Sequence, residues 1–411
     1  MVGSATSPEV LKIPAQRVAA LRERLQQTVD DGYFAGHTVC AVHRGEPLID
    51  EAFGYRDIEE RTPMTTDTIF RIASSTKPII AVGMMLLHEE GAWDFEDRVD
   101  HFIPEFSRLQ VRTKDGSLVD PMQPMRMRHL MSHAAGFGGT GVLDRRREGD
   151  GDGNRGLWFD RLFRGDLQGL VNRLSDKPLA FHPGKRFLYG PCCDVQGYLI
   201  EKLTGKTLDV FLNERIFEPL GMGDTGFWVE PGKTERTASL YAYSGGKLER
   251  IDKPSPERIT RRPSFLSGGG GLWSTPDDYR RFCQMLRSEG AHPSGRLLQA
   301  DTVRKMRQDL LEPQVYVKVV GDYIMPGARF GTNVSVITEP QGDSAMYGKN
   351  SYSWGGAFGT WFWIDPTNDL YASGMVQIRD GGAQHLGMKV EYPDLKQLTA
   401  QMLYWGEERL G

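Results

Sequence analysis

The sequence predicts an α+β protein, an α/β sandwich whose antiparallel sheet is built from both ends of the chain and is flanked by helices. Near the N-terminus, residues 36–44 and 47–55 look like two strands joined by a hairpin turn. Near the C-terminus, residues 329–338, 352–364 and 370–378 are rich in the aromatic and β-branched residues that strands favour. Strands at both ends indicate one sheet that brings the two termini together.

The middle of the chain has a different character. Residues 94–180 consist mostly of helix-like segments and polar loops. We therefore expect a mainly helical domain over residues 81–254, inserted into a sheet domain that is made of residues 1–80 and 255–411. The active site is expected at the interface between the two domains.

Composition and charge restrict the class of function. The 411 residues include 50 Lys and Arg against 54 Asp and Glu, a formal net charge of −4. This balance argues against a nucleic-acid or membrane-surface partner. No apolar run reaches the ~18 residues of a membrane span, and no basic stretch followed by an apolar one marks a signal peptide. We expect a cytoplasmic protein that acts on a small molecule.

Cysteine and histidine give no sign of a metal centre. The four cysteines are Cys40, Cys192, Cys193 and Cys283, and they show no C-x-x-C spacing. The nine histidines include no H-E-x-x-H pattern. We expect reduced thiols, no metal and no cofactor.

Helices are expected where apolar residues recur every three to four positions or form long runs. Residues 15–31 fit the first pattern, and the apolar run that ends at Gly91 fits the second. Residues 191–215 read as two helices separated by a Thr-Gly-Lys-Thr break, and residues 393–409 read as a closing helix.

Two glycine-rich stretches lie between these helices. Residues 133–156 combine glycine with many charges and are expected to form a surface loop. Residues 267–272 (SGGGGL) predict a tight connection. The following residues 274–278 (STPDD) predict a helix start, with a capping residue and a proline in the first turn.

Ser74 and Lys77 form an S-x-x-K pattern at the head of the first long apolar helix. Residues i and i+3 share one helix face, so the two side chains can meet. A serine hydroxyl needs a base to become a nucleophile, and a lysine beside other cations or partly desolvated can serve as one. The same pattern also arises by chance. The strand-like IFRIA before it and the helix after it favour the catalytic interpretation.

Tyr189 is the second candidate. It ends a short apolar segment that follows a Pro-Gly turn, just before a predicted helix. A phenol beside a lysine ammonium is more easily ionised and can relay protons. The alternative is a half-buried core tyrosine, the usual role of a lone tyrosine.

The third candidate is the run Trp354-Gly355-Gly356-Ala357-Phe358-Gly359, which lies within the predicted strand 352–364. Glycines inside a strand mark a bulge or a place where a ligand approaches the backbone. An exposed N–H of Ala357 there, with the N–H of Ser74, would form an oxyanion hole. The alternative is a tight bend at a sheet edge.

Other patterns in the chain carry less weight. Residues 342–346 lack the final glycine of a G-x-S-x-G elbow, and the Gly-Lys-Thr at 205–207 lacks the first glycine of a P-loop. His37, on a strand, is expected to be a satisfied sheet residue. His133 is expected to be structural.

Taken together, the three candidates resemble the serine β-lactamase-like superfamily, which includes class C β-lactamases, penicillin-binding proteins and family VIII carboxylesterases. The resemblance spans roughly residues 20–405 and rests on four segments in matching order: 72–77 (IASSTK), 130–137 (LMSHAAGF), 187–189 (FLY) and 269–278 (GGGLWSTPDD). It implies a β-lactamase/transpeptidase-like fold and a catalytic set of Ser74, Lys77 and Tyr189.

Two departures from the family pattern change the expected substrate. The Y-x-N segment reads Tyr189-Gly190-Pro191 and lacks the asparagine amide. The K-T-G segment reads Trp354-Gly355-Gly356 and lacks the lysine that meets a β-lactam carboxylate. Trp-Gly-Gly at this place is similar to family VIII esterases and related acyltransferases, and a tryptophan offers apolar surface that suits neutral esters.

The sequence therefore predicts a serine hydrolase that cleaves small carboxylic esters through an acyl-enzyme. Trp354, Gly355, Gly356, Phe358 and Phe137 are expected to line the substrate pocket, although the two phenylalanines could equally belong to the core. A β-lactamase or D-amino-acid peptidase or amidase, an acyltransferase of the same superfamily, and a non-catalytic binding protein remain alternatives. A homodimer is an option, because isologous dimers are common among soluble enzymes.

Overall fold

The computed structural model describes residues 11–138, 162–317, 327–379, 381 and 391–405. Its largest element is an eight-stranded sheet in the order β12-β13-β14-β15-β16-β1-β2-β3, in which every pair is antiparallel. The strands are β1 (Gly36–His43), β2 (Glu46–Asp57), β3 (Thr62–Pro63), β12 (Ala328–Phe330), β13 (Ser335–Ile337), β14 (Tyr352–Gly355), β15 (Trp361–Asp365) and β16 (Leu370–Val376).

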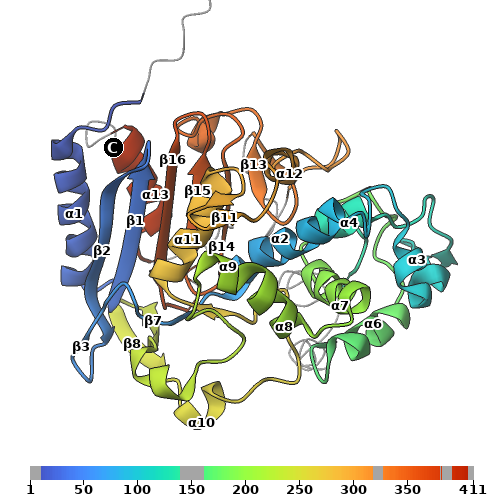
Figure 1. The fold of residues 1–411 in the computed structure, drawn as a ribbon, viewed down its shortest axis with the longest axis horizontal. Helices are drawn as coiled ribbons and strands as arrows, with labels where there is room; N and C mark the ends of the chain where they lie inside the picture. The colour runs from blue at the N-terminus through green and yellow to red at the C-terminus, as the bar shows by residue number, and fades with distance from the viewer. Residues whose placement is uncertain (1–10, 139–161, 318–326, 380, 382–390, 406–411) are drawn as a thin grey trace, which may run out of the picture.

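The pairing of β1 with β16 joins the two ends of the chain into this one sheet. In Figure 1 the blue and red segments accordingly lie side by side. The predicted fold class, an antiparallel sheet from both termini flanked by helices, is confirmed. The division into domains at residues 80 and 255 stays a prediction.

Helices cover both faces of the sheet. The helices α1 (Ala15–Asp30) and α13 (Leu395–Tyr404) lie on one face, and α11 (Pro276–Arg287) packs against β15, β16 and β1 from the other. Side chains along β15 alternate between these layers, as they must along a strand. Trp361 and Trp363 belong to the cluster with α1 and α13, whereas Phe362 and Ile364 face the larger central core.

The remaining helices gather beside the sheet around α2 (Thr76–Glu89), which is buried over most of its length. An apolar helix of this kind needs partners on every side. The others in this group are α3 (Val99–Phe102), α4 (Met127–Met131), α6 (Leu167–Ser175), α7 (Cys192–Thr204), α8 (Leu208–Leu212), α9 (Glu218–Leu220) and α12 (Ala300–Met306). The short helix α10 (Pro256–Ile259) lies apart from them, at the lower edge of Figure 1.

Shorter elements connect these layers. Two-stranded ladders pair β4 (Phe70–Arg71) with β9 (Trp273–Ser274), β5 (Val111–Arg112) with β6 (Leu118–Val119), β7 (Leu240–Ser244) with β8 (Lys247–Asp252), and β10 (Ala291–His292) with β11 (Gly295–Arg296). Single turns are η1 (Ala73–Ser75), η2 (Pro104–Arg108), η3 (Asn213–Phe217), η4 (Pro231–Arg236) and η5 (Gly342–Ser344).

Several local predictions are confirmed. The helix expected over 15–31 is α1, the hairpin expected from 36 to 55 is β1–β2, and the break expected within 191–215 separates α7 from α8. The helix expected over 393–409 is α13, which ends at Tyr404; residues 406–411 lie outside the described part.

Two of the predicted strands were wrong as single strands. Residues 352–364 form a hairpin, because Gly356 N–H donates to Thr360 O at 2.6 Å and closes a turn between β14 and β15. Residues 329–338 likewise form the hairpin of β12 and β13, which turns through Asn333 at a φ of 57°. Aromatic and β-branched residues continue across both turns, so the composition alone does not indicate where each strand ends.

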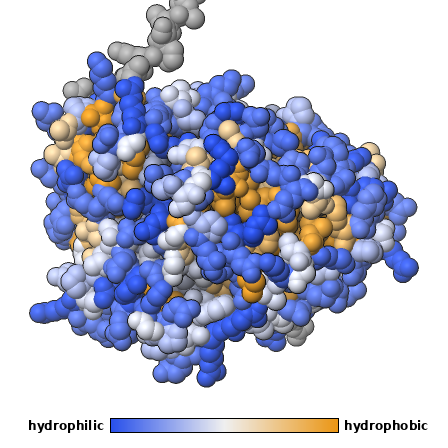
Figure 2. All heavy atoms as spheres, viewed as in Figure 1, coloured by the Kyte–Doolittle hydropathy of each residue, from blue (hydrophilic) through white to orange (hydrophobic). Residues whose placement is uncertain are grey.

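The surface in the view of Figure 2 is mainly hydrophilic, with apolar side chains showing in smaller areas between α1 and the sheet and around α2 and α4. Within the described ranges, no helix has both the length and the apolar content that a membrane crossing needs.

Candidate active site

Ser74 lies in the η1 turn, two residues before Thr76, the first residue of α2. The turn begins at Ala73, whose φ of 45° places a non-glycine residue in the left-handed region. Such strain is retained only where surrounding structure holds it, and it is common at active sites. The turn also places Ser74 at the N-terminus of a long helix, where the partial positive charge favours an anion.

Lys77 is 4 % exposed and points back at Ser74. Its Nζ lies 2.9 Å from Ser74 Oγ and also donates to the carbonyl oxygen of Gly269. Burial alone would lower the pKa of Lys77, but interactions with Tyr189, Cys193 and Asp194 raise it above its usual value. Lys77 is therefore held as an ammonium.

Tyr189 joins the pair from the segment that precedes α7. Its ring centroid lies 4.6 Å from Lys77 Nζ, 4.8 Å from the ring of His133 and 5.4 Å from the ring of Trp354. The structure thus brings together the three predicted residues Ser74, Lys77 and Tyr189, although Tyr189 is more than 100 residues away from the other two in the sequence.

The ring of His133 packs against the ring of Tyr189. It is buried, its φ is 54°, and Gly190 N–H donates to its Nδ1 at 3.4 Å. Burial, helped by the charge of Lys77, lowers the pKa of His133 well below its usual value, so the ring is neutral. These contacts agree with the structural role that the sequence predicted.

The predicted oxyanion segment is the turn between β14 and β15, which packs against η1. Thr360 Oγ1 donates to Ile72 O at 2.8 Å and lies 2.9 Å from Ser75 Oγ, which ties the turn to both sides of Ser74. A Cβ on Gly356 would lie 2.3 Å from Ile72 O, so only glycine permits this approach. Ala357, the next residue, is exposed at the tip.

The predicted substrate-binding residues fall into two groups. Trp354 is 9 % exposed and packs edge-on against Phe330 beside Tyr189, with Gly355 and Phe358 following it on the partly buried turn. Phe137, in contrast, is buried in the core, with its ring centroid 5.4 Å from that of Phe106. Of the loop expected at 133–156, residues 139–156 lie outside the described part.

Asp194 is a site residue that the sequence did not single out. It is buried on α7, and it accepts from Ser267 Oγ at 2.7 Å and from Gly269 N at 3.0 Å. Gly269 in turn supplies the carbonyl oxygen that Lys77 contacts. The glycine run at 267–272 was the only signal, because it marks a backbone that must approach another chain segment closely.

Asn333 was also missed. Its amide donates to Lys77 O at 3.2 Å and to Gln196 Oε1 at 2.7 Å, and its own N–H donates to Met131 O at 3.0 Å. This buried side chain therefore joins α2, α7 and α4 at the level of the site. No pattern in the sequence distinguishes it from an ordinary turn asparagine.

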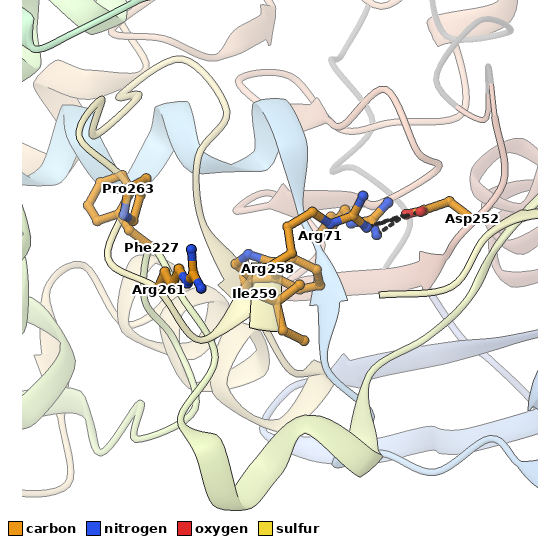
Figure 3. Close-up of a pocket in the computed structure, with 8 residues that line it drawn as sticks. Arg71, Phe227, Asp252, Arg258, Ile259, Arg261 and Pro263 are labelled. Carbon is orange, nitrogen blue, oxygen red and sulfur yellow. Dashed lines mark hydrogen bonds and ion pairs between the residues drawn. The ribbon is translucent and has the colours of Figure 1, made fainter. Parts of the chain in front are cut away.

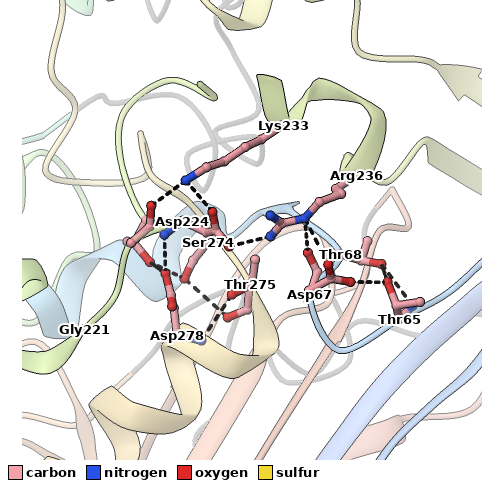
Figure 4. A network of polar contacts seen from close by, with 12 residues as sticks. Thr65, Asp67, Thr68, Gly221, Asp224, Lys233, Arg236, Ser274, Thr275 and Asp278 are labelled. Atoms are coloured by element: carbon pink, nitrogen blue, oxygen red, sulfur yellow. Dashed lines mark hydrogen bonds and ion pairs between the residues drawn. The ribbon is translucent and has the colours of Figure 1, made fainter. Parts of the chain in front are cut away.

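The strand that leads out of the glycine run is fixed by a polar network (Figure 4). Buried Asp278 accepts from Asp224 N at 2.8 Å and from Thr225 Oγ1 at 2.9 Å. Thr275 caps α11 by accepting from Asp278 N at 3.1 Å, as the sequence predicted for this helix start. The network holds β9, and with it the Gly269 segment, against the site.

Across the described part of the chain, no group of three or more His, Cys, Asp or Glu side chains has an arrangement that could hold a metal ion. His37 is fully buried, with Nε2 lying 3.0 Å from Thr28 Oγ1, and burial lowers its pKa to about 4.

The fold and the Ser–Lys–Tyr cluster define a protein of the serine β-lactamase-like class. The profile of the Beta-lactamase family matches residues 21–389, and the chain belongs to that family. It is 33% identical to Protein Rv1367c of Mycobacterium tuberculosis, over 86% of this chain and 88% of that protein. It is 29% identical to Esterase EstB of Burkholderia gladioli, over 88% of this chain and 91% of the relative.

Among solved structures, the chain is similar to EstCE1, described as a hydrolase with promiscuous acyltransferase activity. The TM-score is 0.77 at 24% identity, and the match covers 95% of this chain and 99% of EstCE1. This likeness supports the fold. The family match and the similarity to Esterase EstB relate the chain to serine hydrolases.

Proposed function

We propose that this protein is a carboxylesterase that cleaves small esters through an acyl-enzyme on Ser74. The observation that carries the proposal is the 2.9 Å contact between Lys77 Nζ and Ser74 Oγ, with the Tyr189 ring 4.6 Å from the same ammonium. The similarity to Esterase EstB supports hydrolysis of an ester.

The positive charge on Lys77 determines which residue accepts the proton of Ser74 and which residue stabilises the serine oxygen. An ammonium cannot accept a proton, and the surroundings of Lys77 raise its pKa. We therefore assign the proton of Ser74 to the oxygen of Tyr189, which has to act in its phenolate form, and the stabilisation of the serine oxygen to the ammonium of Lys77. This assignment replaces the expectation that Lys77, helped by Tyr189, takes the proton.

The reaction then proceeds in two displacement steps. Ser74 Oγ attacks the ester carbonyl, and the N–H groups of Ser74 and Ala357 stabilise the oxyanion. Collapse expels the alcohol, which receives the proton from Tyr189 and leaves an acyl group on Ser74. A water molecule, whose proton passes to Tyr189, then attacks the acyl-enzyme. As the bond between Ser74 Oγ and the acyl carbon breaks, Tyr189 returns this proton to Oγ and the acid is released.

The aromatic residues beside Ser74 favour an uncharged substrate group in contact with Trp354. Trp354, Phe330 and Phe187 form an aromatic row there, with ring centroids 5.2 Å and 4.9 Å apart. A lysine in the place of Trp354 would attract a β-lactam carboxylate, and its absence argues against a β-lactamase. The same aromatic row supports acyl transfer to an alcohol as a second candidate, since it disfavours water.

The test is hydrolysis of p-nitrophenyl butyrate and of nitrocefin by the wild type, Ser74→Ala and the control Ser107→Ala, an exposed serine on η2. We expect ester turnover that Ser74→Ala abolishes and Ser107→Ala retains, with little nitrocefin cleavage. Ester turnover that survives in Ser74→Ala would overturn the proposal. Added alcohols that yield new esters faster than acid would favour the acyltransferase.

A further inference from the structure

A hollow of about 230 Å³ opens at the strand that leads to Ser74 (Figure 3). Three guanidinium groups, those of Arg71, Arg258 and Arg261, line it together with one carboxylate, Asp252. Its volume is below the roughly 300–1,000 Å³ of a complete small-molecule site, so it suits one end of a larger substrate.

The charges in this hollow do not balance. Arg71 and Arg258 share the single carboxylate: both donate to Asp252, with Arg258 Nη2 lying 2.9 Å and 3.0 Å from its two oxygens. Within the described ranges Arg261 has no ion pair, and its side chain is exposed. The hollow therefore keeps an excess of positive charge and free N–H donors, the arrangement that recognises a carboxylate.

Short, paired segments tie the hollow to the nucleophile. Arg71 on β4 is three residues from Ser74, which limits their Cα atoms to about 11 Å apart. It pairs in register with Trp273 on β9, four residues after the Gly269 that contacts Lys77. The guanidinium of Arg71 also lies 5.1 Å from the centre of the Trp273 ring, which fixes its direction.

We propose that this hollow binds a carboxylate at the far end of the substrate, so that the preferred ester has an apolar body and a free acid group. Phe227, Ile259 and Trp273 provide the apolar part of the lining, and the arginines provide the anion contacts. The proposal deepens the esterase function and rests on it.

The experiment compares two p-nitrophenyl esters of similar length. The first is p-nitrophenyl hydrogen glutarate, which carries a free carboxylate, and the second is the neutral p-nitrophenyl hexanoate. The quantity measured is the ratio of their kcat/KM values in the wild type, Arg258→Gln and Arg261→Gln. Arg262→Gln is the matched control, because Arg262 is an exposed neighbour whose ion pair with Asp209 lies outside the hollow.

We expect the ratio to fall about tenfold in Arg258→Gln and in Arg261→Gln, the size of a lost charge-assisted contact, and to stay level in Arg262→Gln. It should also fall in the wild type as salt is added. A ratio that is equal in all four proteins, with both esters hydrolysed, would overturn the carboxylate site and leave the esterase intact. If the wild type hydrolyses neither ester in a Ser74-dependent manner, the esterase function itself fails.

Discussion

Asp194 and Lys77 are linked through a single peptide segment. Gly269 donates its N–H to the Asp194 carboxylate at 3.0 Å, and the carbonyl oxygen of the same residue accepts from Lys77 Nζ. Burial raises the pKa of Asp194, while hydrogen bonds from Ser267 and Gly269 oppose this. Asp194 therefore holds the backbone that orients Lys77, and its charge favours the ammonium.

Replacement of Asp194 separates these two effects. Asp194→Asn keeps an acceptor for Ser267 and Gly269 but removes the charge, so we expect about a tenfold loss of kcat/KM and an alkaline limb shifted to lower pH. Asp194→Ala also removes the acceptor and should lose about tenfold more. The measurement is the pH dependence of kcat/KM. If Asp194 had only a structural role, the alkaline limb of the kcat/KM profile would lie at the same pH in Asp194→Asn as in the wild type.

Gly269 is expected to tolerate no side chain. A Cβ there would lie 2.7 Å from Asp194 Oδ2, so Gly269→Ala should cost about 1–3 kcal/mol of stability and displace the carbonyl that Lys77 contacts. Gly223→Ala is the control, because a Cβ at Gly223 meets nothing within 4 Å. Thermal unfolding and ester turnover should both distinguish the two variants; equal behaviour would contradict the close approach.

Thr360 should couple energetically to Ser75. Thr360→Val keeps the shape but removes the bonds to Ile72 O and Ser75 Oγ, which should cost about 1–3 kcal/mol and weaken the placement of Ala357. Urea unfolding of Thr360→Val, Ser75→Ala and the double variant measures the coupling. We expect an interaction energy of at least about 0.5 kcal/mol. Strict additivity would count against the contact.

Lys396 should make stability depend on alkaline pH. Burial lowers its pKa from 10.5 to about 8, and its Nζ lies 3.0 Å from Ser353 Oγ. Between these pH values the unfolded chain keeps the proton that the folded chain releases, so stability rises with pH. Below about pH 8 both states carry the proton, and this gain is absent.

The measurement is urea unfolding at pH 7 to 10 of the wild type, Lys396→Met and the exposed control Lys349→Met. Relative to Lys396→Met, the wild type should gain about 1–2 kcal/mol between pH 8 and 10, less than full burial implies because Lys396 keeps some solvent contact. Lys349→Met should follow the wild type. Parallel curves for wild type and Lys396→Met would refute the shift.

The local sequence was sufficient for elements whose pattern lies within one turn or one helix. The apolar spacing over 15–31, the hairpin of β1 and β2, and the capped start of α11 at Thr275 depend on neighbours a few residues apart. The local sequence was insufficient to predict the hairpin at residues 352–364. The turn there is closed by Gly356 and Thr360, whereas the composition of the whole segment is typical of a strand.

By itself the sequence determined the fold class and predicted Ser74, Lys77 and Tyr189 as the catalytic set, because the S-x-x-K spacing and the order of the segments resemble the serine β-lactamase-like superfamily. Only the tertiary structure decided that Tyr189 reaches Lys77, that Asp194 and Asn333 support the site, and that Phe137 belongs to the core. These relationships join residues far apart in the chain, and long-range packing, which no local pattern encodes, sets their distances.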